Sequence, residues 1–211
     1  MLKSIKYVLY LHKTIVHIDD FYNMIGDNLA EKLPLVDNDG NLIGSATRGE
    51  CHGIITDTGK TSVDDRPVIK KKLLHPVVHL HLFNSAGELY LQKRPDWKKI
   101  QPGKWDTATG GHVDFGESVS DALVREVREE LGISDFTPVF LEKYIFESPV
   151  ERELIYMFKA VYDGEVCPSE ELDGGRFWSE DEIRKAMGQG ILTPNFESEY
   201  KRLLTYLEKS K

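Results

Sequence analysis

Carboxylates gather near the middle of the chain, in the stretch GHVDFGESVSDALVREVREELGI that runs from Gly111 to Ile133. Glu126, Glu129 and Glu130 stand at positions i, i+3 and i+4, so on a helix their side chains would share one face at about 5–6 Å spacing. Like charges so placed destabilise a helix by roughly 0.2–0.5 kcal/mol per pair. Because hard divalent cations prefer oxygen ligands, a bound cation would offset this repulsion, and we predict a Mg2+ or Mn2+ site here. Three glutamates alone would more often form a solvent-exposed acidic face, so the surrounding residues decide between the two interpretations.

An amphipathic helix is predicted to carry these glutamates. Its apolar residues recur every four positions, at Val119, Leu123, Val127 and Leu131. Ser118 with Asp121 three residues later resembles a capping box at the start, and Gly132 offers a left-handed stop at the end. Glu117 lies just before the helix, where it could reach Arg125 across two turns and fix the preceding loop to the helix.

This stretch resembles the signature box of the Nudix hydrolases, G-x5-E-x7-R-E-U-x-E-E-x-G-U with U an apolar residue, and it matches every specified position. At ordinary residue usage, such a match arises by chance on the order of once in 10^8 start positions. The resemblance implies hydrolysis of a diphosphate linkage in a nucleoside diphosphate or another X-linked diphosphate, with Mg2+ or Mn2+ as cofactor. The metal ligands it implies are Glu126, Glu129, Glu130 and the Gly111 carbonyl. The catalytic residues it implies are Glu129 as general base, Glu130, and Arg125 as the residue that orients the glutamates. Glu151 and Glu153 are alternative bases.

Residues 34–187 are also similar to the branch of this superfamily that contains the isopentenyl-diphosphate isomerases. The segments LVDNDGNLIG, ATRGECH, LLHPVVHLHLFNSAGELYLQKR and QPGKWDTATGGHV follow that branch in order. This resemblance implies a second metal site for manganese or zinc, with the ligands His52, His75, His112, Glu151 and Glu153. The same residues could instead persist as polar residues without a metal. His79 and His81 match no ligand position, and we interpret them as strand residues.

One departure from the isomerases favours hydrolysis. Where they carry a catalytic cysteine, this chain has Gly110, which can neither donate nor accept a proton. The expected function is therefore diphosphate hydrolysis. An isomerase-like enzyme is the alternative, and a nucleotide-binding module without turnover is a third hypothesis.

Basic residues cluster shortly before the box, at Lys93, Arg94, Lys98, Lys99 and Lys104. Cations placed there could neutralise the phosphates of a substrate. We take Lys93, Arg94, Lys99 and Lys104 as candidate substrate-binding residues. A solvated basic loop is the alternative interpretation.

The remaining pattern predicts an α/β sandwich, in which helices cover both faces of a mixed sheet (α/β/α). We expect a hairpin at 35–44, a surface loop at 53–72, and strands at 75–83, 89–93, 138–146, 153–162 and 177–178. Further helices are expected at 180–187, capped by Ser179, and from the cap Asn195 to about 207. Residues 1–33 are expected to form an N-terminal extension, with a short strand or helix and then a helix near 19–32. Residues 34–211 would be the Nudix domain, which agrees with the fold that the resemblance implies.

Composition limits the partners and the compartment. The chain has 211 residues, of which 27 are Lys or Arg and 35 are Asp or Glu, so its formal net charge is -8. Such a surface does not attract nucleic acid or anionic membranes. The two cysteines form no CxxC pair, and no apolar run reaches the roughly 18 residues of a membrane span. We expect a cytoplasmic enzyme with a small-molecule diphosphate substrate, no nucleic-acid or membrane partner, and a homodimer as one candidate assembly.

Overall fold

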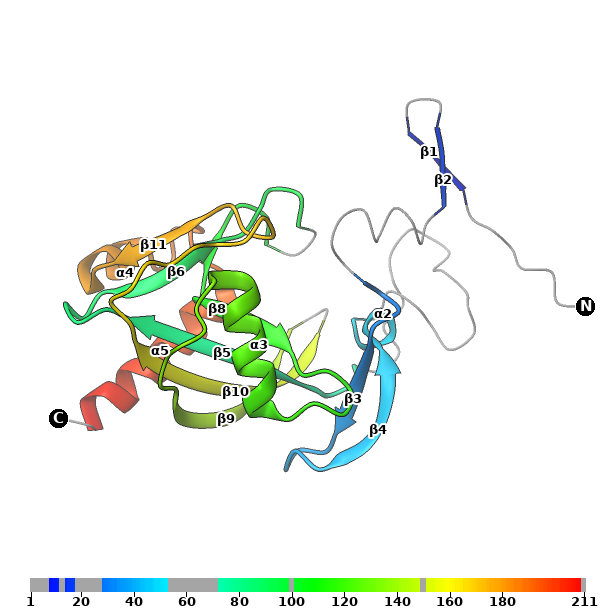
Figure 1. Cartoon of the computed structure of the whole chain (residues 1–211), viewed down its shortest axis with the longest axis horizontal. Coiled ribbons are helices and arrows are strands. Elements are labelled where there is room, and N and C mark those ends of the chain that lie inside the picture. Colours follow the sequence, from blue (N-terminus) through cyan, green and yellow to red (C-terminus); the bar gives the residue numbers. More distant parts are fainter. Residues whose placement is uncertain are drawn as a thin grey trace, which may run out of the picture.

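A computed structural model of the chain describes residues 8–11, 14–17, 28–52, 72–98, 101–148 and 151–209 (Figure 1). The strands are β1 (Val8–Leu11), β2 (Thr14–His17), β3 (Lys32–Val36), β4 (Leu42–Thr47), β5 (His75–Phe83), β6 (Leu89–Lys93), β7 (Trp105–Asp106), β8 (Thr109–His112), β9 (Val139–Glu147), β10 (Arg152–Val161) and β11 (Gly175–Trp178). The helices are α2 (Arg48–Cys51), α3 (Val119–Leu131), α4 (Glu180–Ala186) and α5 (Pro194–Lys209). The loop predicted at 53–72 falls, except for its last residue, outside the described residues.

The central sheet has the strand order β11-β6-β5-β10-β9, with β7 paired to β6 and β8 paired to β5. β5 and β10 run parallel, with Glu153 opposite His75 and Met157 opposite His79. The other pairs of this sheet are antiparallel. A strand that lies centrally and pairs in parallel is normally covered on both faces. β5 fits that rule, because all its residues except Phe83 are buried.

Helices cover the two faces of this sheet, as Figure 1 shows. On one face α3 packs Leu123 and Val127 against Leu80, within a core that also holds Val78 and Leu82. On the other face α4 and α5 pack against β6 and β11, with Phe196 and Leu203 among the buried residues. The predicted α/β/α architecture with a mixed sheet is confirmed.

The helix that carries the glutamates begins and ends as its sequence predicts. Ser118 is the N-cap of α3, and its hydroxyl oxygen accepts a hydrogen bond from Asp121 N. The second bond of a full capping box is replaced here, because the Ser118 hydroxyl donates to the Asp121 carboxylate. Gly132 ends the helix at φ 70°, a left-handed conformation that glycine adopts without the cost that a side chain would bring.

Near the N-terminus the predicted helix at 19–32 is wrong where the structure describes it. Residues 29–30 form a turn and Lys32 begins β3, while residues 18–27 lie outside the described part of the chain. Pro34 disfavours a helical conformation in the residue before it, and the pairing of β3 with β4 takes its place. The predicted hairpin is therefore present, and it begins before residue 35. β1 and β2 form a separate antiparallel pair.

One predicted helix cap is wrong, and three short elements of the fold were not predicted. Asn195 does not cap the last helix, because α5 already begins at Pro194. Proline is pre-organised for the first helical position, and Thr193 Oγ1 accepts the hydrogen bond from Phe196 N. The short strands β7 and β8 and the one-turn helix α2 were not predicted; α2 is started by a capping box between Thr47 and Glu50. In the described part of the chain, no helix is both long enough and apolar enough to cross a bilayer.

Candidate active site

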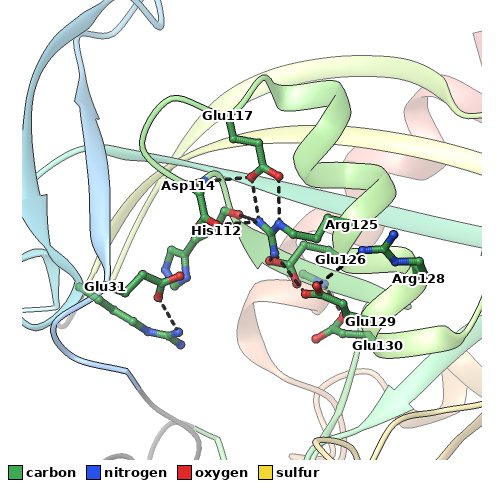
Figure 2. A network of polar contacts seen from close by, with 11 residues as sticks. Glu31, His112, Asp114, Glu117, Arg125, Glu126, Arg128, Glu129 and Glu130 are labelled. Atoms are coloured by element: carbon green, nitrogen blue, oxygen red, sulfur yellow. Dashed lines mark hydrogen bonds and ion pairs between the residues drawn. The ribbon is translucent and has the colours of Figure 1, made fainter.

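Arg125 is the centre of a polar network that joins α3 to the loop before it (Figure 2). Its Nε and Nη2 donate to the two carboxylate oxygens of Glu117, both at 2.9 Å. Nη2 also donates to the His112 carbonyl oxygen at 2.9 Å, and Nη1 donates to Glu126 Oε1 at 2.7 Å. The hydrogen bonds to Glu117 raise the pKa of Arg125. The predicted Glu117–Arg125 pair is thus present, and a bidentate pair of this kind fixes geometry as well as charge.

Glu126 and Glu130 lie against the two glycines of β8. Gly110 N donates a hydrogen bond to Glu130 Oε2 at 3.3 Å. A Cβ added to Gly111 would lie 2.0 Å from Glu126 Cδ, so only a glycine leaves room for this carboxylate. Both glutamates line a hollow of about 190 Å3. The structure thereby brings together three of the four expected ligands: Glu126, Glu130 and Gly111.

Glu129, the expected general base, stands at the rim of this site. Its side chain is 53% exposed, and it contacts Arg125 at 3.4 Å and Arg128 at 3.9 Å. Among the described residues that line the hollow, Glu129 does not appear. Figure 2 shows it beside Glu130 on the same side of the helix.

Burial makes these carboxylates costly to ionise, and a bound divalent cation would offset that cost. Burial raises the pKa of Glu130 to about 8, and the negative charge of Glu126 adds to the effect. Burial also raises the pKa of Glu126, which Arg125 opposes. Two desolvated carboxylates beside a backbone that a glycine leaves open form an oxygen-donor set of the kind that Mg2+ and Mn2+ take.

A second cluster is formed by three histidines from separate elements. His52 follows α2, His75 begins β5 and His112 ends β8, and their ligand atoms all lie within 4.8 Å of one another. His52 Nε2 and His112 Nε2 are 3.2 Å apart. Burial lowers the pKa of His52 to about 3 and that of His75 to about 4, and it also lowers the pKa of His112. The imidazoles are therefore neutral at pH 7, which is the form that binds metals.

The two glutamates expected with this cluster lie beside it. Glu151 Oε2 is 3.7 Å from His52 Nδ1, and Glu153 is the strand partner of His75. Burial raises the pKa of Glu153 to about 8, with a further contribution from the charge of Glu151. Three neutral imidazoles and two carboxylates would suit manganese or zinc.

His52 and His112 of this cluster line a larger cavity of about 540 Å3, which adjoins the smaller hollow. The residues that line both spaces are Arg48, His52, Gln92, Arg94, Gly110, Gly111 and His112. Arg48 lies on α2 and forms an ion pair with Glu31 at 3.1 Å. Arg94 forms an ion pair with Asp106 at 3.4 Å. These two arginines are the cations that the cavity and the hollow share among the described residues.

The predicted basic cluster is divided by the fold. Arg94 lines both the cavity and the smaller hollow, and Lys98, which is not among the four candidate substrate-binding residues, lines the smaller hollow. Lys93 instead pairs with Asp173. Lys104 lines neither space, and Lys99 lies outside the described residues.

Gly110 and Gly111 lie on opposite faces of the sheet, and each leaves space where a side chain would otherwise project. In the β5–β8 ladder Gly111 pairs with Val78, and Gly110 pairs with His79. Because successive strand residues project to opposite faces, Gly111 faces α3 and its glutamates, while Gly110 faces the side of α5. A Cβ added to Gly110 would lie 3.3 Å from His79 Cδ2 and Nε2.

His79 forms a buried ion pair with Glu199 of α5, a contact between residues 120 positions apart. His79 Nδ1 is 2.8 Å from Glu199 Oε2, and the two residues are 7% and 1% exposed. Burial alone would lower the pKa of His79, but the charge and hydrogen bond of Glu199, with the charges of Glu153 and Asp106, raise it to about 9. Burial alone would raise the pKa of Glu199. The charges of His79 and His81 outweigh this effect and lower that pKa. His79 is therefore a cation at neutral pH.

This pair predicts a pH dependence of stability. A histidine whose folded pKa exceeds its unfolded value stabilises the fold fully below about pH 6.5, and that contribution is lost as the pH rises toward 9. The free energy of unfolding should therefore fall between pH 6.5 and 9, by on the order of 2–3 kcal/mol from this pair. Urea unfolding across this range would measure it.

The double variant His79→Gln/Glu199→Gln is the matched comparison, because a single change would leave one charge buried and unpaired. The raised pKa values of Glu130 and Glu153 also make stability fall with pH, and they remain in the variant. The variant should therefore show a smaller decline than the wild type. Parallel pH profiles for the two proteins would show that His79 does not titrate as described.

Sequence reasoning missed Arg48, His79 and Glu199. For Glu199 a signal was present, because it lies on the same face of the last helix as Phe196 and Leu203, where a charge is rarely buried without a partner. For His79 the signal was its place on a strand face with two other histidines. Arg48 lies within the quoted segment ATRGECH, and nothing in its spacing indicates where it points.

Comparison with known proteins identifies the family of the chain. The family model described as "NUDIX domain" matches residues 73–196. An uncharacterized Nudix hydrolase of Streptomyces coelicolor is 30% identical over 179 residues, which cover 82% of this chain and 88% of that protein. One from Pseudomonas aeruginosa is 42% identical over 97 residues, covering 46% and 57%. An isopentenyl-diphosphate Delta-isomerase of Mycolicibacterium vanbaalenii is 33% identical over 141 residues, covering 66% and 65%. The chain thus spans less than two thirds of the last two proteins.

Solved structures share the fold. A Deinococcus radiodurans protein superposes with a TM-score of 0.62 at 20% identity, covering 82% of this chain and 98% of that one. A MutT protein from Methanosarcina mazei superposes with a TM-score of 0.55 at 26% identity, covering 65% and 96%.

Proposed function

The chain belongs to the NUDIX domain family, and on that premise we propose that it is a divalent-metal-dependent hydrolase of the diphosphate linkage in a nucleoside diphosphate or another X-linked diphosphate. The observation that carries the proposal is the position of Glu126 and Glu130 against the glycines of β8, with Arg125 fixing Glu126. Both glutamates line one hollow, which fits the oxygen-donor set of a Mg2+ or Mn2+ site.

Each residue of this site has a proposed task. Glu126, Glu129, Glu130 and the Gly111 carbonyl would hold the cation. When bound, such an ion polarises the phosphoryl oxygens and makes water more acidic. Arg125 keeps Glu126 and the loop at His112 in place through its hydrogen bonds.

The general base is the least constrained of these tasks. Glu130 lines the hollow, and its Oε2 accepts a hydrogen bond from Gly110 N at 3.3 Å, which fixes its position there. Glu129 is more exposed and lies at the rim. Glu153 lies opposite His75, on the other face of the sheet from α3. We therefore favour Glu130 as the base and retain Glu129 as the alternative.

Cations around the hollow would neutralise the diphosphate. Arg48, Arg94 and Lys98 line it, and two of them also line the larger cavity. Guanidinium groups bind phosphate oxygens in a bidentate manner, which orients the linkage as well as attracting it. Lys93, Lys99 and Lys104 remain candidate substrate-binding residues, although Lys93 and Lys104 line neither the hollow nor the cavity and Lys99 lies outside the described residues.

A screen of diphosphates for phosphate release tests the proposal. Nucleoside diphosphates and other X-linked diphosphates would be offered with Mg2+ or Mn2+, and turnover of at least one is expected. Binding of a nucleotide without turnover of any compound would favour the nucleotide-sensing module instead.

A second function is favoured by one specific observation, the histidine cluster with Glu151 and Glu153. These residues have the donor types that the resemblance to isopentenyl-diphosphate isomerases implies. Gly110 argues against that activity, because it offers no acid or base. The cluster fits manganese or zinc as a second metal site, whichever reaction the protein performs.

The isomerase alternative yields its own prediction. Wild type should give no detectable exchange of protons from D2O into isopentenyl diphosphate, followed by NMR. Gly110→Cys should not restore exchange well, because its Cβ would lie 3.3 Å from His79, and a catalytic group must sit within about 0.5 Å of its productive position. Robust exchange by the wild type would replace the hydrolase proposal with the isomerase, and Tyr144, Glu151 or Glu153 would then be the proton-transfer candidates.

The remaining features of the proposal concern the whole chain. We place the Nudix domain at 34–211 and the extension at 1–33, although β3 crosses that boundary because it begins at Lys32. Both cysteines are free thiols, and a reducing cytoplasm stays part of the proposal. Homodimer formation and the lack of nucleic-acid or membrane partners stay part of the proposal.

A further inference from the structure

The cavity on the α5 side of the sheet is larger than a diphosphate alone would need. Its volume is about 540 Å3, within the range of small-molecule sites. It joins the smaller hollow at Gly110 and Gly111, where the carboxylates of α3 lie. A diphosphate held in the hollow would therefore extend its attached group, X, into this cavity.

Part of the cavity wall is polar and is not shared with the hollow that the α3 glutamates line. The polar residues of this part include His79, Asp106, Thr107, Thr193 and Asn195, and the cavity also has apolar surface from Val77, Phe146 and Pro194. Asp106 Oδ1 accepts hydrogen bonds from Thr193 Oγ1 and Thr107 N, both at 2.9 Å, so this acid is held in place. Among the described residues, Asn195 Oδ1 has no hydrogen-bond partner although the atom is buried. A hydrocarbon placed here would desolvate these groups without bonding to them, which costs free energy.

His79 is a residue of this wall whose orientation is fixed by a buried partner. Glu199 holds its Nδ1 at 2.8 Å, which leaves Nε2 as the nitrogen for a ligand. Nε2 would be 3.3 Å from a Cβ on Gly110, so the missing side chain at Gly110 gives access to it. In the described part of the chain, no group forms a hydrogen bond with Nε2.

We propose that His79, positioned by Glu199 and uncovered by Gly110, binds an acceptor atom of the group X and selects diphosphates whose X is a polar nucleoside or sugar over those whose X is a hydrocarbon. This assignment rests on the proposed function for the place of the diphosphate. Because His79 is protonated at neutral pH, its Nε2–H donates a charge-assisted hydrogen bond, which is stronger than a neutral one.

Binding of non-hydrolysable ligands tests this selection apart from catalysis. The probes are methylene-bridged analogues of ADP, UDP, ribose 5-diphosphate and isopentenyl diphosphate, titrated calorimetrically with Mg2+ present. Methylenediphosphonate, which lacks X, reports the diphosphate alone. Wild type should bind at least one polar analogue more tightly than the isopentenyl analogue and methylenediphosphonate. The nucleoside and ribose arms show which kind of polar X is selected.

His79→Leu should weaken binding of that polar analogue by on the order of 10–100-fold, the range for a hydrogen bond to a charged group. Its affinity for methylenediphosphonate should stay within about twofold of wild type. A general loss of structure would weaken both ligands together, so the ratio of the two affinities isolates the role of His79. If His79→Leu does not fold because Glu199 is left unpaired, His79→Leu/Glu199→Leu removes both buried polar groups and serves in its place.

His81→Leu is the matched control. His81 lies on the same strand face, 3.6 Å from Glu199 and against Phe196, but it does not line the cavity. It should keep the wild-type ratio of affinities. An unchanged ratio in His79→Leu, equal binding of isopentenyl and polar analogues by the wild type, or no analogue that binds more tightly than methylenediphosphonate would each overturn the proposal. Hydrolysis of a simple diphosphate could still be observed in all three cases, so the proposed function is judged separately.

Discussion

Glu130→Gln is expected to keep the fold and to lower kcat/KM for a confirmed diphosphate substrate by on the order of 10^2–10^4-fold. The substitution preserves the shape of the side chain but removes its charge, and so removes a metal-holding and proton-accepting group from the hollow. Because Glu130 is a desolvated acid whose pKa is already raised to about 8, a neutral amide should not lower the Tm by more than a few degrees.

Steady-state kinetics and thermal unfolding on the same preparations would measure this effect. Glu165→Gln is the control for charge, since Glu165 is exposed and lines neither the hollow nor the larger cavity. If Glu129 is the base, Glu129→Gln is expected to lower kcat/KM by a factor in the same range as Glu130→Gln. A folded Glu130→Gln protein with wild-type kcat/KM would remove Glu130 from the site.

Gly111→Ala is expected to lower kcat/KM by roughly 100-fold or more with little change in Tm. The added Cβ would lie 2.0 Å from Glu126 Cδ. Glu126 ends in a flexible side chain, so the carboxylate can swing away and the backbone can stay in place. A displacement of about 1 Å in a positioning group can cost on the order of 100-fold in rate, and the Glu126–Arg125 hydrogen bond at 2.7 Å would be lost as well.

Gly44→Ala is the matched control for this glycine. Gly44 also lies in a strand, and a Cβ added there meets no described atom within 4 Å. It should keep wild-type kcat/KM. Wild-type turnover by Gly111→Ala would show that the position of Glu126 does not matter for the reaction.

The parts of this site that lie close together in sequence could be predicted from it. The cap at Ser118, the stop at Gly132 and the pair between Glu117 and Arg125 all depend on spacings within α3 and the loop before it. Helical periodicity fixes which side chains share a face, so the helix and its glutamates followed from the pattern alone.

Features that depend on strand pairing could not be predicted from the sequence. The parallel pairing of β5 with β10 places Glu153 beside His75, 78 residues apart. The pairing of β8 with β5 decides that Gly110 faces His79 while Gly111 faces α3. Which ladder forms depends on packing between distant segments, and a shift by one residue would exchange the two faces.

The predictions for the basic cluster and the histidine cluster depend on where side chains point, which the sequence does not show. Lys93 and Arg94 are neighbours, yet Lys93 pairs with Asp173 and Arg94 faces the cavity. Charge density along the chain could not separate them. The family resemblance supplied the ligand types for the histidine cluster, whereas the close approach of its three rings became visible only in the fold.

Metal dependence of hydrolysis tests the central claim most directly. The purified wild-type protein would be treated with a chelator, freed of it, and assayed with the best diphosphate of the screen while Mg2+ or Mn2+ is added back. The claim predicts no turnover before addition, recovery that saturates with the ion in the wild type, and little recovery in Glu130→Gln. Turnover that survives chelation, or equal recovery in wild type and Glu130→Gln, would contradict it.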